Sequence, residues 1–238
     1  MTESEKLWFY DQIKNIDPNG DFVNIDKDSF QISYTNKLKS DETGQKSFNP
    51  EEIVHALIFC LLTSPGFNYP LDKLYHEKHY KHGSAGSLSD EVDFLIFDED
   101  NLPYALWEVK APNEFLKKES DAIKYQLFGT ATLVGVPKYL VYATILPKGV
   151  TPIISLKCID YTEIKTYESW IEEGSPSYNN FPIEYKDLNY DPLKNGSKTN
   201  DLKTDCTQAD FRAAAATFHN EFFGEHPDNI LFVNLVKC

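Results

Sequence analysis

The stretch that decides the fold reads Asp90-Glu91-Val92-Asp93-Phe94-Leu95-Ile96-Phe97-Asp98, then Glu99-Asp100-Asn101-Leu102-Pro103, then Leu106-Trp107-Glu108-Val109-Lys110-Ala111-Pro112. The first and last parts are apolar runs of strand length, and the polar segment between them predicts a turn, so the whole stretch predicts a β-hairpin. Side chains alternate between the two faces of a strand, so Glu108 and Lys110 are expected on the same face. The hairpin would also bring Asp93 close to this pair.

Two carboxylates and a lysine on otherwise apolar strands indicate a chemical site. Charged groups on a buried strand are costly unless they pair with each other or bind a ligand. The chemistry that this set suits is metal-dependent cleavage of a phosphodiester. In such a site Asp93 and Glu108 hold Mg²⁺, and Lys110 positions the attacking water or stabilises the developing charge. The simpler interpretation is an ion pair between Glu108 and Lys110 on a solvent-facing side of the strand.

The segments around the hairpin predict an α/β fold, a central mixed β-sheet flanked by helices at 50–64 and 114–135. Asn49-Pro50-Glu51-Glu52 is typical of a helix start, with Asn as the cap, Pro in the first position and acids in the first turn. Residues 114–134 predict one long helix. Strands are expected around 22–34, at 138–145, where the sequence is almost continuously apolar, and at 151–158. A helix is expected at 161–172.

Taken together, these segments resemble the PD-(D/E)xK nuclease superfamily and, within it, the N-terminal domain of type I restriction enzyme R subunits. The resemblance covers roughly residues 48–146. It is carried by Pro50-Glu51-Glu52-x-Val54-His55, by Tyr69-Pro70 with the Glu77 region, by Glu108-Val109-Lys110-Ala111-Pro112 and by 139–144. The chain departs from the family pattern at His55, where the family usually has Arg. It departs again at Thr130, where a Tyr would follow Gln126 by four residues.

The resemblance implies a set of site residues and an activity. Metal-dependent endonucleases of this family hydrolyse double-stranded DNA with Mg²⁺, for which Mn²⁺ substitutes. Asp93, Glu108 and the carbonyl of Val109 would hold the metal, and Lys110 would act on the nucleophile. A glutamate in the first helical turn lies at the edge of the site; counting back from His55 favours Glu51, and Glu52 is the alternative. Gln126 is expected to face the site from the following helix.

The run from His76 to His82 also raises zinc as a possibility. It offers no cysteine partner, and its spacing is not the His-Glu-x-x-His pattern that places two ligands on one helical face. We therefore predict an exposed strand and loop here, from which Glu77 alone approaches the site.

The domain organisation expected from the sequence has three parts: a nuclease domain at 1–174 with its core at about 48–160, an irregular linker at 175–206 and a helical appendage at 207–238. The appendage resembles the helical lead-in of N6-adenine DNA methyltransferases. This predicts a fragment of a longer restriction–modification polypeptide, whose partners are methyltransferase and specificity subunits or fused domains. The chain contains no phosphate-binding Gly-x-x-x-x-Gly-Lys-[Ser/Thr] motif.

Charge and composition restrict how the chain could meet DNA. Its net charge is −14, and its only arginine is Arg212. Tight binding to DNA on its own requires phosphate neutralisation, so we expect other domains to deliver this one. Scattered cysteines and the lack of a transmembrane run or signal peptide predict a cytoplasmic protein with reduced thiols. The rival interpretations are a non-catalytic module that docks DNA or partner subunits and a stand-alone DNA-repair nuclease.

Overall fold

The computed structural model describes residues 1–42, 44–81 and 89–195. The helices are α1 Glu3–Ile16, α2 Glu52–Thr63, η1 Leu71–Lys73, α3 Phe115–Asp121, η2 Ala122–Phe128, α4 Tyr167–Glu172, η3 Tyr185–Tyr190 and α5 Pro192–Asn195. The strands are β1 Val23–Ile25, β2 Ile32–Tyr34, β3 Lys39–Ser40, β4 Leu74–Lys81, β5 Ser89–Phe97, β6 Pro103–Val109, β7 Tyr139–Ile145 and β8 Ile154–Asp160. Among the described helices, none is long and apolar enough to cross a membrane.

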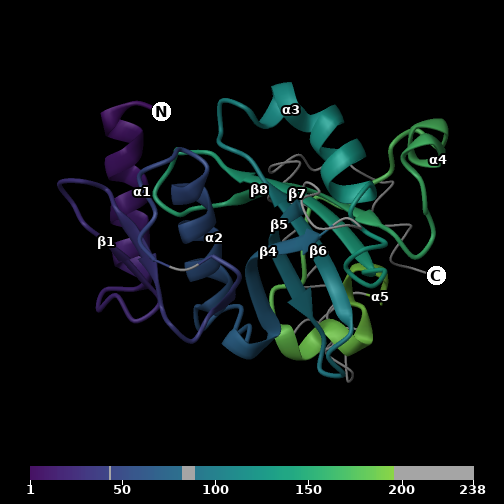
Figure 1. The fold of residues 1–238 in the computed structure, drawn as a ribbon, viewed down its shortest axis with the longest axis horizontal. Helices are drawn as coiled ribbons and strands as arrows, with labels where there is room; N and C mark the ends of the chain where they lie inside the picture. The colour runs from purple at the N-terminus through teal and green to yellow at the C-terminus, as the bar shows by residue number, and fades with distance from the viewer. Residues whose placement is uncertain (43, 82–88, 196–238) are drawn as a thin grey trace, which may run out of the picture. The chain divides into compact units, whose positions relative to one another are not determined.

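A six-stranded sheet in the order β3-β4-β5-β6-β7-β8 forms the centre of the structure (Figure 1). The β3–β4 and β6–β7 pairs are parallel, and the other neighbours are antiparallel. The mixed α/β fold expected from the sequence is therefore confirmed at this level. The predicted hairpin is β5–β6, and β1 and β2 form a separate two-stranded sheet.

Two apolar cores lie on opposite faces of the sheet. Helix α2 covers one face, where Phe94 and Trp107 point, and α1 packs on the outer side of α2 (Figure 1). Helices α3 and η2 cover the other face, where Leu95 and Leu106 point. This division follows from strand alternation, because neighbouring residues of a strand face opposite sides. Both faces of the β5–β6 hairpin are thus buried, and a charged side chain on it needs a partner inside the protein.

The helix predicted at 114–134 is shorter than expected and changes type along its length. The α-helical part ends at Asp121, and Ala122–Phe128 form a π-helix, in which the Gly129 N–H bonds the Lys124 carbonyl at 3.1 Å. A Cβ at Gly129 would lie 2.2 Å from the carbonyl oxygen of Tyr125, so only glycine fits this turn. Apolar periodicity cannot reveal such an inserted residue, which is why the sequence predicted a continuous helix.

The segment at 175–195, predicted as linker, packs against the same core as α2. Phe181, Tyr185 and Leu188 are buried. The Tyr69 hydroxyl donates to the Pro182 carbonyl at 2.9 Å. The described residues up to 195 belong to one compact unit, and the helix expected from 207 lies outside the described residues.

Candidate active site

The candidate site lies where strands β5 and β6 separate. Their regular pairing reaches Phe94 and Trp107 and goes no further. Beyond that point the carboxylate of Asp93 accepts the backbone N–H of Val109 at 2.6 Å, in place of a bond between the two backbones. The end of the hairpin is therefore held open by a side chain, and the groups on the following residues of β6 become available for chemistry.

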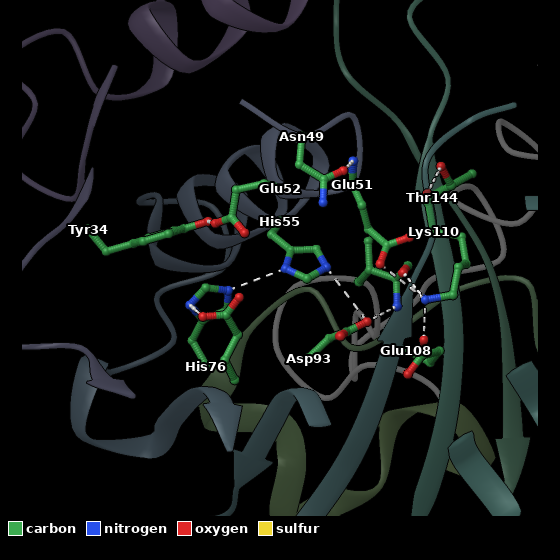
Figure 2. Close-up of polar contacts among 12 residues, drawn as sticks. Tyr34, Asn49, Glu51, Glu52, His55, His76, Asp93, Glu108, Lys110 and Thr144 are labelled. Carbon is green, nitrogen blue, oxygen red and sulfur yellow. Dashed lines mark hydrogen bonds and ion pairs between the residues drawn. The ribbon is translucent and has the colours of Figure 1, made fainter. Parts of the chain in front are cut away.

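Lys110 occupies the centre of this opening (Figure 2). Its ammonium contacts the carboxylate of Glu108, the carbonyl of Val109 at 3.0 Å and the carboxylate of Glu51 at 3.3 Å. Its backbone is fixed to the neighbouring strand, because its N–H donates to the Ala143 carbonyl at 3.0 Å and its carbonyl accepts the Thr144 hydroxyl at 2.7 Å. The Glu108–Lys110 pair expected from the sequence is formed, and it is buried rather than solvent-facing.

The electrostatics of the site are dominated by buried negative charge. Burial and the nearby Asp93 carboxylate raise the pKa of Glu108 well above its ordinary value. Burial would also raise the pKa of Asp93, but the His55 imidazole, the Lys110 ammonium and the Val109 N–H outweigh it and lower that pKa. Burial tends to lower the pKa of Lys110, and the surrounding carboxylates overcome this and raise it. Lys110 is therefore protonated. The carboxylates around it would also attract a further cation.

His55 joins the site, a role that the sequence had not assigned to it. Its Nε2 lies 3.6 Å from the carboxylate of Asp93. Burial lowers the pKa of His55, but the charge of Asp93 opposes this and raises the pKa to about 9. The signal in the sequence was its position, because His55 stands where the pattern of the resembled family has Arg.

The two glutamates at the start of α2 have different surroundings. Asn49 accepts the N–H of Glu51 at 3.0 Å, but α2 begins at Glu52, two residues after the start at Pro50 that the sequence predicted. Glu51 then contacts Lys110, whereas Glu52 is buried on the other side of the helix and accepts the Tyr34 hydroxyl at 2.6 Å. Gln126 lies on the exposed side of η2, and within the described residues it makes no hydrogen bond to the site.

The prediction that the His76–His82 run is an exposed strand and loop is wrong for its first residues. His76 is 1% exposed and Glu77 is 5% exposed. They face Glu52 and His55 of α2, so the partners missing from the run itself come from a helix that is distant in sequence. Local spacing could not show this, because the contact depends on how α2 packs on β4.

The oxygen atoms at the hairpin opening are of the type that a hard divalent cation binds. Asp93, Glu108 and the Val109 carbonyl offer carboxylate and carbonyl oxygens, the ligands that Mg²⁺ and Mn²⁺ prefer. Among the described residues, the groups of three or more carboxylate or imidazole side chains that converge within 4.8 Å are Glu52/His55/His76/Glu77 and Glu42/His79/Glu91. This degree of convergence is not reached by Glu51, Asp93 and Glu108. The Lys110 ammonium contacts Glu51 and Glu108.

No protein-family model and no curated protein matches this sequence.

Proposed function

We propose that this chain is the Mg²⁺-dependent endonuclease domain of a type I-like restriction–modification system, with a PD-(D/E)xK-like core, and that it hydrolyses phosphodiester bonds of double-stranded DNA. The observation that carries the proposal is the convergence of Asp93, Glu108 and Lys110 at the open end of the β5–β6 hairpin. The restriction–modification context rests on the resemblance of residues 48–146 to R subunits.

Each residue has a role that follows from its contacts. Asp93, Glu108 and the Val109 carbonyl would hold the metal, which when bound supplies Lewis-acid polarisation of the phosphate. The Val109 N–H donates to the Asp93 carboxylate and so fixes this side chain of β5 against β6. Lys110 would hold the attacking water or stabilise charge on the phosphate oxygens. Glu51, which is partly exposed at the helix start, faces the same ammonium and can orient it.

The charge of the chain favours delivery to DNA by other domains. A net charge of −14 opposes capture of a polyanion from solution. Methyltransferase and specificity subunits, or domains fused to this chain, would supply the affinity and the recognition sequence.

The test is plasmid cleavage by the 238-residue chain, assayed both alone at low salt and fused to a sequence-specific DNA-binding domain that replaces the missing delivery. We expect nicking with Mg²⁺ or Mn²⁺ that EDTA abolishes. Lys110→Ala should lower the rate by roughly 100-fold or more, because it removes a charge aimed at the reacting phosphate. The matched control is Lys73→Ala, which removes a lysine that bonds the Glu99 carbonyl and Asn101 at the other end of the hairpin.

The expected result for Lys73→Ala is the wild-type rate. If the fused wild-type chain cuts no DNA with either metal, the nuclease assignment is wrong and the non-catalytic docking module is favoured. If Lys110→Ala cuts as fast as wild type, the role given to this lysine is wrong.

A further inference from the structure

We propose that Glu52, His55, His76 and Glu77, named here the His/Glu cluster, form a second metal site that takes a borderline transition ion such as Zn²⁺. The cluster joins two residues of α2 to two residues of β4, and all four side chains are at least nine-tenths buried. Their ligand atoms lie within 4.8 Å of one another. This site is separate from the oxygen ligands at the hairpin opening and does not depend on the proposed nuclease activity.

The donor set indicates the class of metal. Two imidazoles and two carboxylates form an N₂O₂ set, which suits Zn²⁺ and related ions better than Mg²⁺. Nδ1 of His55 and Nε2 of His76 are 3.3 Å apart. A tetrahedral ion with metal–nitrogen bonds of about 2.0–2.1 Å needs its nitrogen ligands roughly 3.3–3.4 Å apart. The two rings thus already have the spacing of adjacent ligands (Figure 2).

An unusual backbone conformation of Glu77 makes the cluster possible. Consecutive residues of a strand normally point to opposite faces, so His76 and Glu77 should not meet the same partners. Glu77 has a φ of 48°, in the left-handed region that non-glycine residues rarely adopt. The pairing of β4 with β5 continues on both sides of it, at His76 and at Lys78. This local turn of the chain places both side chains beside α2.

The ligands also have outer partners of the kind that metal sites use. Ligating imidazoles commonly give their second nitrogen to a carboxylate, which fixes the ring. Nε2 of His55 lies 3.6 Å from Asp93, which is outside the cluster. The Tyr34 hydroxyl holds one oxygen of Glu52 at 2.6 Å, which leaves the other for a metal.

The cluster also has a charge that a cation would balance. Two carboxylates, Glu52 and Glu77, are buried in it, and Lys46 lies 2.7 Å from one oxygen of Glu77. A divalent ion bound between the four side chains would add positive charge beside both carboxylates.

A cavity gives the cluster a route to solvent. It has a volume of about 420 Å³, and its lining includes Tyr34, Lys46, His76 and Glu77 together with polar side chains of the segment from Ser33 to Glu42. An ion can therefore reach the two β4 ligands without opening the sheet. Because His55 also faces Asp93, an ion here would fix the orientation of a residue of the proposed nuclease site.

The test is titration of the metal-free 238-residue chain with Co²⁺, read by visible absorption, and with Cu²⁺, read by electron paramagnetic resonance. We expect the intense absorption of a tetrahedral Co²⁺ ion and hyperfine coupling to two imidazole nitrogens. Oxygen-only coordination in the wild-type chain, or no binding, would overturn the proposal whatever the variants do.

Two variants assign the ion to the cluster. His76→Gln and the isosteric Glu77→Gln should each weaken Co²⁺ binding by about 100-fold or more, since even the loss of an outer partner typically costs 10–100-fold. The matched control is His79→Gln, three residues along the same strand, which disrupts the exposed Glu42/His79/Glu91 group. It should bind Co²⁺ as wild type does.

A loss of binding in His79→Gln with retention in Glu77→Gln would place the ion in the exposed group and contradict the proposal. Lys110→Ala should bind Co²⁺ normally even if it abolishes DNA cleavage. A chain that binds Co²⁺ as expected but never cuts DNA would leave this site intact and count only against the nuclease function.

Discussion

Asp93 on β5 and Asp98 directly after it are both buried and each accept one backbone N–H, yet their surroundings differ completely. Asp98 accepts the Leu102 N–H at 2.9 Å, and its own N–H donates to the Leu102 carbonyl at 2.9 Å. It closes the turn of the hairpin. Asp93 accepts the Val109 N–H at 2.6 Å and also faces His55 and Lys110. One carboxylate completes a turn, and the other belongs to a charged site.

The difference comes from the elements packed over each end of the hairpin. At the turn end, the Lys73 ammonium donates to the Glu99 carbonyl at 3.0 Å and to the Asn101 side chain at 2.7 Å. This cation therefore contacts backbone and amide oxygens and not Asp98. At the open end, the first turn of α2 brings Glu51 and His55 to the strand. A buried carboxylate is thus not a functional signal by itself. What matters is whether other charged groups converge on it.

The largest expected difference between Asp93 and Asp98 concerns metal binding. We expect Asp93→Asn to weaken Mn²⁺ binding by roughly 100-fold, because it removes a charged oxygen ligand. Asp98→Asn should bind Mn²⁺ as wild type does and instead lose about 1–2 kcal/mol of stability through the weakened turn. Calorimetric titration with Mn²⁺ and urea unfolding in EDTA measure the two effects. Equal Mn²⁺ affinity in both variants would contradict the assignment of Asp93.

An effect of medium size concerns the free energy of unfolding, which the buried Glu108 carboxylate at the open end lowers. The folded-state pKa of Glu108 is raised, so the folded chain holds this proton more tightly than the unfolded chain does. Stability should therefore fall as pH rises from near 4.5, the ordinary value, through the folded-state pKa. Glu108→Gln removes this dependence. In EDTA it should be more stable than wild type by about 1–2 kcal/mol at pH 8, and the gain should vanish near pH 4.5.

Urea unfolding at the two pH values measures this effect. The control is Glu119→Gln, which breaks a partly exposed ion pair with Lys157 and should change stability by less than about 1 kcal/mol at either pH. A Glu108→Gln variant that is less stable than wild type at pH 8 would show that the pairing with Lys110 outweighs the burial of its charge.

The smallest expected effect concerns DNA binding. With a net charge of −14, the chain should bind duplex DNA only weakly at physiological salt and lose that binding as salt rises. Lys117 and Lys118 are exposed on α3, in the segment that follows the open end. Their joint replacement by Ala should weaken low-salt binding roughly fivefold and flatten its salt dependence. Lys73→Ala, at the turn end, should have no such effect. Fluorescence anisotropy with a labelled duplex measures both, and tight binding that resists salt would favour a stand-alone nuclease.

The parts of the structure that the sequence predicted depend on local rules. Alternation and turn composition predicted the β5–β6 hairpin, and the Asn-Pro-Glu-Glu start predicted α2. The pairing of Glu108 with Lys110 followed because residues two apart on a strand share a face. The same rules failed at η2, where one inserted residue converts an α-helix to a π-helix without changing the apolar pattern.

The sequence by itself determined the β5–β6 hairpin, the presence of α2 and which residues of β6 carry charge, because these features depend on neighbours along the chain. Only the tertiary structure decided which charged groups meet. The contact of Lys110 with Glu51 and the contact of His55 with His76 each join distant segments, and both depend on where α2 packs on the sheet. The tertiary structure also buries His76 and Glu77, which the sequence predicted to be exposed. Burial and long-range contact arise from packing, and no local pattern encodes them.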